Sequence, residues 1–180
     1  MSGRIICIAM LLLAFSIFSG CAKDAAIKPS PFVKDGTDTL TIPENKIDRT
    51  ALIELVNGLR SRGCNCGDVK MPAVGPLTWS GLLEKAAYLH SKDMALHQYF
   101  DHTGLDGSTP GTRMDAAGYR WNKYGENIAS GQMEEQAVIM GWLSSPQHCK
   151  NMMDANFTEV GIGLYDKDWT MELGRRSVTQ

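Results

Sequence analysis

The clearest strand pattern of the chain lies near the C-terminus and reads Phe157-Thr158-Glu159-Val160-Gly161-Ile162-Gly163-Leu164-Tyr165. Its branched and aliphatic side chains recur at every second position, which is the period of a β-strand. Turn residues at 166–168 separate it from the run between Trp169 and Leu173, which predicts a second strand. We therefore expect a small antiparallel sheet at the C-terminal end of the chain.

Helical patterns fill the chain before this sheet. Apolar residues three and four positions apart, with polar capping residues and closing glycines, predict helices at residues 48–63, 80–97, 109–118 and 134–143. Helices followed by a small sheet are typical of a layered α+β domain. The expected fold class is therefore α+β.

The first twenty residues have the pattern of an export signal. Arg4 precedes an apolar run at 5–18, which is shorter than the ~20 residues that a membrane-spanning helix needs. The run ends at Phe18-Ser19-Gly20-Cys21, which resembles the lipobox of bacterial lipoproteins, whose cysteine is acylated. We expect a signal peptide at 1–20 and a lipid on Cys21. Cleavage without acylation is the alternative.

The rest of the chain divides into a tether, one domain and a short tail. Prolines without an apolar period predict a flexible, lipidated tether at 21–47, a domain at 48–174 and a tail at 175–180. No aspartate follows Cys21, and in the resembling lipoproteins that residue favours retention at the inner membrane. The predicted location is the bacterial cell envelope, at the outer membrane or surface where the organism has one.

Charge excludes one class of partner. The formal net charge is -2, and acidic and basic residues are interspersed without a basic cluster. Proteins that bind nucleic acid usually present such a cluster to the phosphates. We therefore expect no nucleic-acid partner.

Three cysteines remain in the domain, namely Cys64, Cys66 and Cys149. In an oxidising compartment we expect one disulfide, from Cys149 to either Cys64 or Cys66. A zinc site made by the three sulfurs and His148 is the alternative, although Cys-x-Cys is tighter than the usual spacing of structural zinc ligands.

Titratable side chains stand beside aromatic or turn-forming residues in short segments around His102, Glu126 and His148. Such positions are typical of groups held at the rim of a cleft by a rigid scaffold. We predict a polar binding cleft formed by His102, Glu126, Asn127, His148, Asn156 and Glu159.

The order and spacing of these segments resemble the CAP superfamily, which comprises cysteine-rich secretory proteins, antigen 5 and pathogenesis-related 1 proteins, and within it the bacterial SCP-like branch. The resemblance covers residues 48–174 and implies a three-layer α-β-α sandwich and an extracellular location. It is carried by Phe100-Asp101-His102-Thr103, Asp106-Gly107, Pro110, Arg113, Ala117-Gly118-Tyr119, Gly125-Glu126-Asn127-Ile128-Ala129, Trp142, Ser145-Pro146, His148, Phe157-Thr158-Glu159-Val160-Gly161 and Trp169-Thr170.

Eukaryotic members of that family carry two histidines and two glutamates that can hold a divalent metal. His102 and Glu126 match the first of each, whereas Ser145 and Asn156 stand where the second glutamate and histidine would be. The bacterial branch offers a histidine after Ser-Pro instead, which here is His148. The resemblance thus implies a possible site for Zn²⁺ or another divalent metal at His102, Glu126 and His148.

Two imidazoles and one carboxylate can act in three ways. They suffice to hold a zinc ion with an open position that activates water. They can also hydrogen-bond to one another and organise a polar cleft without a metal, or work as a metal-free acid-base pair. The sequence leaves these alternatives open.

Binding is the function that the sequence favours, because no nucleophile elbow accompanies the cleft. We expect an exported, lipid-anchored binding or interaction module at the cell envelope. Members of the resembling family bind lipids and sterols, so the expected partner is a lipid, a sterol or another envelope ligand. The alternative is a hydrolase of envelope polymer, peptide or phosphodiester, in which a metal or Glu126, the candidate catalytic residue, activates water.

Overall fold

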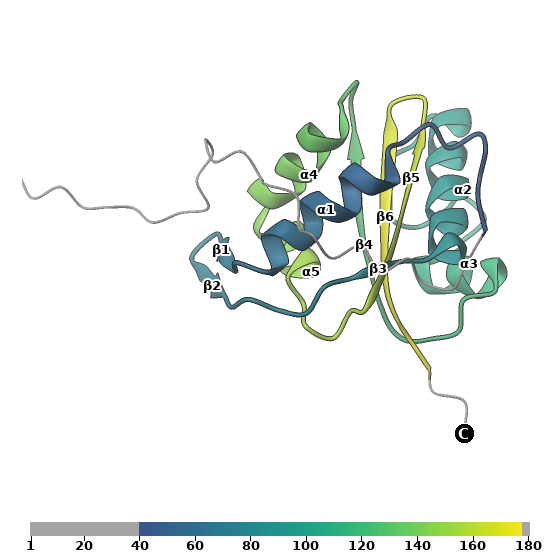
Figure 1. The fold of residues 1–180 in the computed structure, drawn as a ribbon. Helices are drawn as coiled ribbons and strands as arrows, with labels where there is room; N and C mark the ends of the chain where they lie inside the picture. The colour runs from purple at the N-terminus through teal and green to yellow at the C-terminus, as the bar shows by residue number, and fades with distance from the viewer. Residues whose placement is uncertain (1–39, 178–180) are drawn as a thin grey trace, which may run out of the picture.

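The computed structural model describes residues 40–177, which form a central sheet between two groups of helices (Figure 1). The predicted signal peptide, Cys21 and the tether as far as residue 39 lie outside the described residues, as do residues 178–180. This architecture confirms the α+β class and the α-β-α sandwich. In chain order the elements are α1 Arg49–Arg60, β1 Cys64–Cys66, β2 Val69–Met71, β3 Thr78–Trp79, α2 Gly81–His97, α3 Pro110–Ala117, β4 Trp121–Ser130, α4 Glu135–Ser144, α5 Pro146–Met152, β5 Glu159–Tyr165 and β6 Asp168–Arg176.

The central sheet has four strands in the order β3-β5-β6-β4. β5 and β6 pair antiparallel, as the alternating sequence predicts. β4 also pairs antiparallel with β6, but β3 runs parallel to β5, so the sheet is mixed rather than purely antiparallel. β4 gives no clear sequence signal, because Gly125 and the buried polar residues Glu126 and Asn127 interrupt any apolar alternation.

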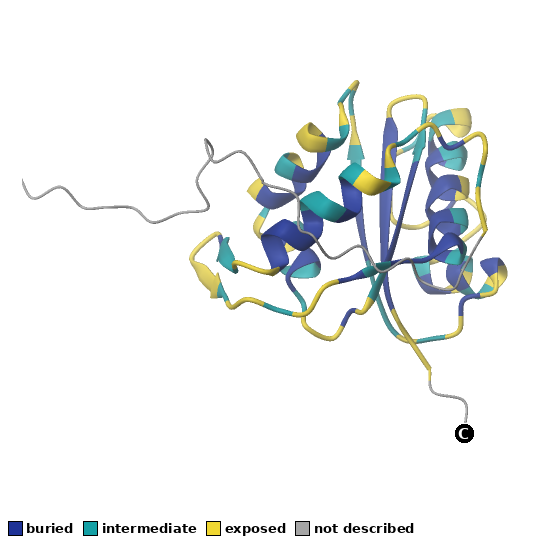
Figure 2. Ribbon diagram, viewed as in Figure 1, coloured by how far each residue is buried: buried dark blue, intermediate teal, exposed yellow. Residues whose placement is uncertain are grey.

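Helices cover both faces of the sheet. α2 packs on β5 and β6, and α3 packs on α2, while α1, α4 and α5 lie on the opposite side (Figure 1). Each side has its own core, a small one that includes Leu83 and Met114 beside α2 and α3, and a larger one that includes Trp142 and Ile162. Buried residues accordingly concentrate in the sheet and on the inner sides of the helices (Figure 2).

α2 approaches β5 so closely that no side chain fits between them. A Cβ atom on Gly161 would lie 2.0 Å from the backbone nitrogen of Glu84, and one on Gly163 would lie 2.2 Å from that of Tyr88. Glycine in a strand often marks such a close approach of another backbone. Gly161 and Gly163 of β5 therefore set the distance between α2 and the sheet.

The folded domain begins before the predicted boundary at residue 48. Asn45 is buried, and its side-chain amide donates to Glu84 Oε1 at 2.8 Å and to the carbonyl of Ile162 at 2.9 Å. The same side chain accepts a hydrogen bond from the Leu164 backbone N–H at 2.9 Å. Residues predicted to be tether thus belong to the domain, and at the other end β6 continues to Arg176, inside the predicted tail.

A buried arginine fixes α1 to the segment between α5 and β5. The Arg60 guanidinium is 1% exposed and donates to the carbonyls of Gly75, Met152, Asp154 and Phe157 at 2.7 to 3.2 Å. Burial lowers the pKa of Arg60 to about 10, which still leaves it charged at neutral pH. The four carbonyls accept hydrogen bonds from four of the five N–H donors of the guanidinium, which compensates for its removal from water.

A disulfide between Cys66 and Cys149 ties the β1–β2 hairpin to α5. This pairing is one of the two that the sequence left open. The disulfide links residues that are 83 positions apart in the sequence. A cross-link of that span lowers the conformational entropy of the unfolded chain and so stabilises the fold.

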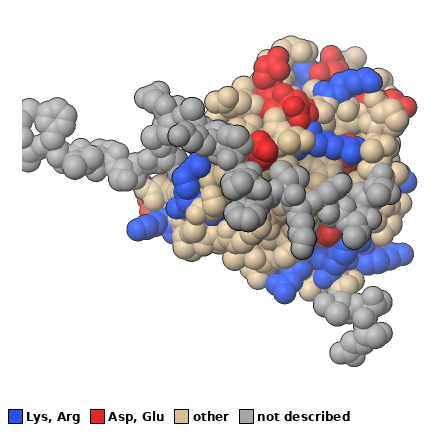
Figure 3. Space-filling view, viewed as in Figure 1, with Lys and Arg blue, Asp and Glu red and all other residues tan. Residues whose placement is uncertain are grey.

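The surface of the domain carries charges of both signs. Both signs of charge occur on the face shown in Figure 3, where acidic groups gather toward the upper edge and basic groups are spread from the upper right to the lower edge. Within residues 40–177, every helix is too short or too polar to cross a bilayer.

We expect Gly161→Ala to destabilise the domain by about 3 kcal/mol, because the added methyl group meets the α2 backbone, which cannot rotate away. Gly141→Ala is the matched control. Gly141 is exposed within α4 and has open space around it, so alanine there should stabilise the domain by about 0.5 to 1 kcal/mol. Urea unfolding measures both changes, and equal stability of the two variants would contradict the close approach.

Candidate functional site

Glu126 is a buried carboxylate whose two oxygens are both occupied. It lies within β4 and is 6% exposed. Its Oε1 accepts a hydrogen bond from His102 Nδ1 at 2.6 Å, and its Oε2 accepts one from Arg113 Nη2 at 2.5 Å. The carboxylate therefore lies between two groups that can carry positive charge.

Local sequence places the two partners of Glu126. Arg113 stands one turn into α3, which Thr109 caps and Pro110 opens. Its guanidinium also donates to the backbone carbonyls of Ser108 at 3.1 Å and His102 at 3.0 Å. Arg113 thus holds both the carboxylate and the loop that carries His102.

The contact between His102 and Glu126 shifts the pKa of both residues. The hydrogen bond to Glu126 raises the pKa of His102 above its ordinary value, although partial burial opposes this. Burial alone would raise the pKa of Glu126, but the hydrogen bond from His102 and the charge of Arg113 outweigh it, so that pKa is lowered. Each shift favours the charged form, so the contact is an ion pair at mildly acidic pH.

The orientation of His102 follows from this pair. Since Nδ1 faces Glu126, Nε2 is the ring nitrogen left to meet a ligand, and the side chain is 51% exposed. A carboxylate that fixes one ring nitrogen and thereby aims the other is a common arrangement at functional sites.

Glu172 is a member of this cluster that the sequence analysis does not single out. It lies on β6 directly opposite Glu126, is fully buried, and has its Oε1 4.0 Å from Arg113 Nε. Neither of its oxygens accepts a hydrogen bond from the described residues. Burial and then the charge of Glu126 raise the pKa of Glu172 well above its usual value, so we assign it as a neutral acid facing Glu126.

His90 anchors the beginning of the loop that carries His102. It lies on α2, is 1% exposed, and its Nε2 lies 3.0 Å from the carbonyl oxygen of Asp101. Because a carbonyl only accepts, Nε2 carries the proton in this contact. Burial lowers the pKa of His90, which keeps the ring neutral. The sequence does not reveal this role, because the partner of His90 is a backbone carbonyl eleven residues away.

Asn127 and His148 lie on the other side of β4. Successive strand residues point to opposite faces, so Asn127 faces α5 while Glu126 faces α2 and α3. Its amide donates to the carbonyl of His148 at 3.1 Å, and Asn151 donates to Asn127 Oδ1 at 2.9 Å and to the Glu126 carbonyl at 3.1 Å. Burial, and then the charge of His102, lower the pKa of His148.

Two predicted cleft residues have separate partners. The side chain of Asn156 donates to Asp154 at 2.7 Å within a local turn. Glu159 accepts from Tyr119 at 2.5 Å and from Arg176 at 2.9 Å, near the far end of β6. The structure therefore brings His102 and Glu126 together, places Asn127 and His148 behind them, and puts Asn156 and Glu159 elsewhere.

The predicted metal ligands do not assemble in this arrangement. Among residues 40–177, the one group of three potential ligands whose donor atoms lie within 4.8 Å of one another is Cys64, Cys66 and Cys149. His102, Glu126 and His148 do not form such a group, and both Glu126 oxygens already accept hydrogen bonds. The donor set favours a polar network over a three-ligand metal centre.

Comparison with known proteins identifies the family of this domain. The profile of the Cysteine-rich secretory protein family (CAP) matches residues 53–171, well over half of the chain. The chain belongs to this family. The protein YkwD of Bacillus subtilis (strain 168) is 29% identical over 147 residues, which make up 79% of this chain and 54% of YkwD. The chain thus spans about half the length of that relative.

Solved structures show the same domain in bacteria. An extracellular protein with an SCP domain from Bacillus anthracis str. Ames has a TM-score of 0.63 and 32% identity, covering 70% of this chain and 39% of its own. An outer surface protein from Borrelia burgdorferi has a TM-score of 0.53 and 26% identity, covering 58% of this chain and 80% of its own. The CAP fold predicted from the sequence is confirmed.

We expect Glu126→Gln to destabilise the domain by on the order of 3 kcal/mol, since it leaves Arg113 largely buried beside a neutral amide. The raised pKa of His102 adds stability that is complete below the ordinary histidine pKa and is lost as pH rises through the folded value. The lowered pKa of Glu126 adds stability that is complete above the ordinary glutamate pKa and is lost as pH falls through the folded value. The cost of the substitution is therefore greatest between those two ordinary pKa values.

Urea unfolding across pH measures that cost, and NMR titration of His102 should show its pKa falling in the variant. His97→Gln is the control, because His97 forms an exposed pair with Asp93 and should change stability by less than ~0.5 kcal/mol. A His102 pKa that is unchanged in Glu126→Gln would contradict the ion pair.

Proposed function

We propose that this CAP-domain protein is an exported binding module, anchored at the bacterial cell envelope, whose cleft binds an anionic group of an envelope ligand through His102. The chemistry that fits is a phosphate or carboxylate, such as a lipid headgroup or an acidic polymer carries. The observation that carries the proposal is the complete pairing of Glu126, which leaves the outer nitrogen of His102 as the exposed polar group of the cluster.

Charge within the cluster supports an anionic ligand. Arg113 and protonated His102 contribute two positive charges, Glu126 contributes one negative charge, and Glu172 is neutral. Below the pKa of His102 these four groups sum to one positive charge, which the half-exposed imidazolium presents to solvent next to the exposed carboxylate of Asp101. Hydrogen bonds between charged partners are stronger than neutral ones, which favours a phosphate or carboxylate over a neutral headgroup.

The same pairing argues against the hydrolase alternative. A general base works best with a pKa near the working pH, whereas the pKa of Glu126 is lowered and its oxygens face His102 and Arg113. A water molecule would have to displace one of these partners to be activated. Binding requires no such displacement, because it uses the side of His102 that is already exposed.

Export fits the descriptions of two solved relatives. One solved neighbour is described as an extracellular protein and another as an outer surface protein. Together with the apolar run at 5–18 and the small residues before Cys21, this supports a location outside the cytoplasm, with a lipid on Cys21 as the attachment to the membrane. A single acyl chain binds a bilayer only weakly, so a lipoprotein-type anchor would carry more than one.

We expect the chain to bind vesicles that contain phosphatidylglycerol more tightly than vesicles of phosphatidylcholine alone, and to show NMR shifts at His102 with inorganic phosphate. His102→Gln should weaken phosphate binding about tenfold, because one charge-assisted hydrogen bond is worth ~1.5 kcal/mol or more. Binding should fall as pH rises through the His102 pKa, which is raised.

His97→Gln serves as the matched control, since it removes an exposed histidine from α2 and leaves the Glu126 cluster intact. Equal binding of phosphate by the wild type and His102→Gln would refute the proposed anion-binding site. Binding to neutral vesicles alone would instead favour an apolar ligand.

We also expect mass spectrometry of the mature protein to show an N-terminal Cys21 that carries acyl groups. Cys21→Ser is the control, and it should shift the protein from the membrane fraction to the soluble fraction. An unmodified N-terminus in the wild type would leave a plainly cleaved signal as the export route.

A further inference from the structure

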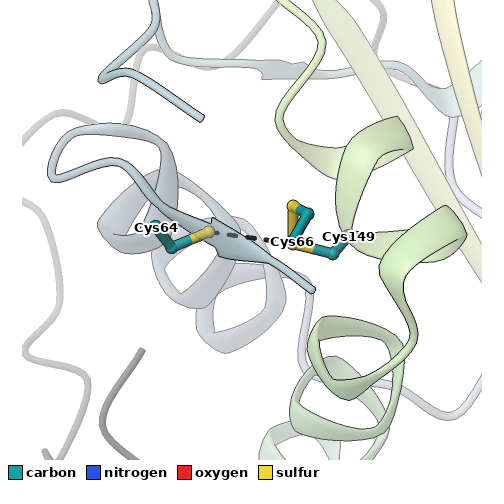
Figure 4. Close-up of side chains that lie close together, drawn as sticks. All are labelled: Cys64, Cys66 and Cys149. Atoms are coloured by element: carbon teal, nitrogen blue, oxygen red, sulfur yellow. Dashed lines mark hydrogen bonds between the residues drawn. A yellow bond between two sulfur atoms is a disulfide. The ribbon is translucent and has the colours of Figure 1, made fainter. Parts of the chain in front are cut away.

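Three sulfur atoms meet between the β1–β2 hairpin and α5 (Figure 4). Cys66 and Cys149 form the disulfide, and Cys64 contributes a thiol whose Sγ lies 3.7 Å from the Sγ of Cys149. All three sulfurs lie within 4.8 Å of one another. A separation of 3.7 Å is van der Waals contact, so only a short movement separates the thiol from the disulfide.

The hairpin explains why both cysteines reach the same partner. Cys64 and Cys66 are two residues apart on β1, and strand side chains two apart point to one face. Backbone pairing of β1 with β2, in which Cys64 lies opposite Met71 and Cys66 opposite Val69, fixes this orientation. Either hairpin sulfur is therefore presented to Cys149 on α5.

Burial distinguishes the three sulfurs. Cys66 is 1% exposed and Cys149 is fully buried, whereas Cys64 is partly exposed. A thiolate is the attacking species in disulfide chemistry, and it forms more easily where solvent reaches the sulfur. Cys64 is thus the member of the cluster suited to attack, and the buried bond beside it is the target.

We propose that Cys64, Cys66 and Cys149 form a thiol–disulfide exchange site, in which Cys149 changes partner between Cys66 and Cys64. This inference does not rest on the proposed function of the His102 cleft.

The exchange is balanced and needs no outside oxidant or reductant. The Cys64 thiol loses its proton to water, and its thiolate attacks the Sγ of Cys149. The new Cys64–Cys149 bond forms while the Cys66–Cys149 bond breaks, and its electron pair leaves on the Sγ of Cys66, which takes up a proton. One disulfide and one thiol are present before and after.

The two linkages differ little in chain entropy. The sequence separation is 83 residues for Cys66–Cys149 and 85 for Cys64–Cys149, and loop entropy varies only with the logarithm of loop size. Exchange leaves a buried thiol at Cys66, and a buried cysteine packs as a small apolar side chain. Local contacts of the hairpin, rather than the span of the cross-link, therefore set the balance between the two forms.

The test maps disulfides in the full chain purified from an oxidising compartment, with acid quenching and digestion at low pH to stop further exchange. In Cys66→Ser we expect a Cys64–Cys149 disulfide in a folded monomer. Cys64→Ser is the matched control and should keep the Cys66–Cys149 bond. A folded Cys66→Ser monomer that leaves Cys149 reduced would overturn the proposal.

A second measurement uses the unaltered chain, and it decides the matter if Cys66→Ser does not fold. After incubation near pH 8.5, where about half of an ordinary cysteine is thiolate, both linkages should be found. Alkylation of Cys64 beforehand should abolish the Cys64–Cys149 form. Detection of the Cys66–Cys149 linkage alone, at every incubation time, would overturn the proposal.

Discussion

A buried carboxylate requires hydrogen-bond donors and positive charge beside it, and Glu126 creates this requirement in the middle of β4. Two parts of the chain meet it. The loop after α2 supplies His102 and α3 supplies Arg113, whereas Asn151 of α5 binds the backbone carbonyl of the same residue. The packing of α3 and of the loop after α2 at the edge of the sheet therefore depends on this one side chain.

Glu172 shows how tightly the charge in this cluster is controlled. Two acids on neighbouring strands, directly opposite each other, cannot both ionise without strong repulsion. Arg113 makes its short contact with Glu126 and lies 4.0 Å from Glu172, so the negative charge resides on Glu126. The neutral acid fills the space beside it without adding charge, and the cluster consequently stays positive toward solvent when His102 is protonated.

The sequence predicts the parts of this molecule that follow a repeating pattern. β5, β6 and the principal helices have clear periods, and His102 and Glu126 stand out as polar groups beside aromatic and turn residues. The sequence does not predict β4 or the role of Glu172, because polar residues interrupt the apolar alternation of a buried strand. Burial of such residues is stable only when residues distant in the sequence provide hydrogen bonds or charge. The order of residues along the chain groups Asn156 and Glu159 with the cleft, because it does not reveal that Glu159 accepts hydrogen bonds from Tyr119 and Arg176.

α5 joins the two chemically distinct regions of the domain. Cys149 fixes it to the hairpin, and the neighbouring residue, His148, accepts a hydrogen bond from Asn127 on the strand that holds Glu126. Asn151, two residues beyond Cys149, donates two hydrogen bonds to that strand. Because the helix has only seven residues, it has little length over which to absorb a shift of Cys149. A change of disulfide partner would therefore act on the backbone of His148 and, through the side chains of Asn127 and Asn151, on the strand that holds Glu126.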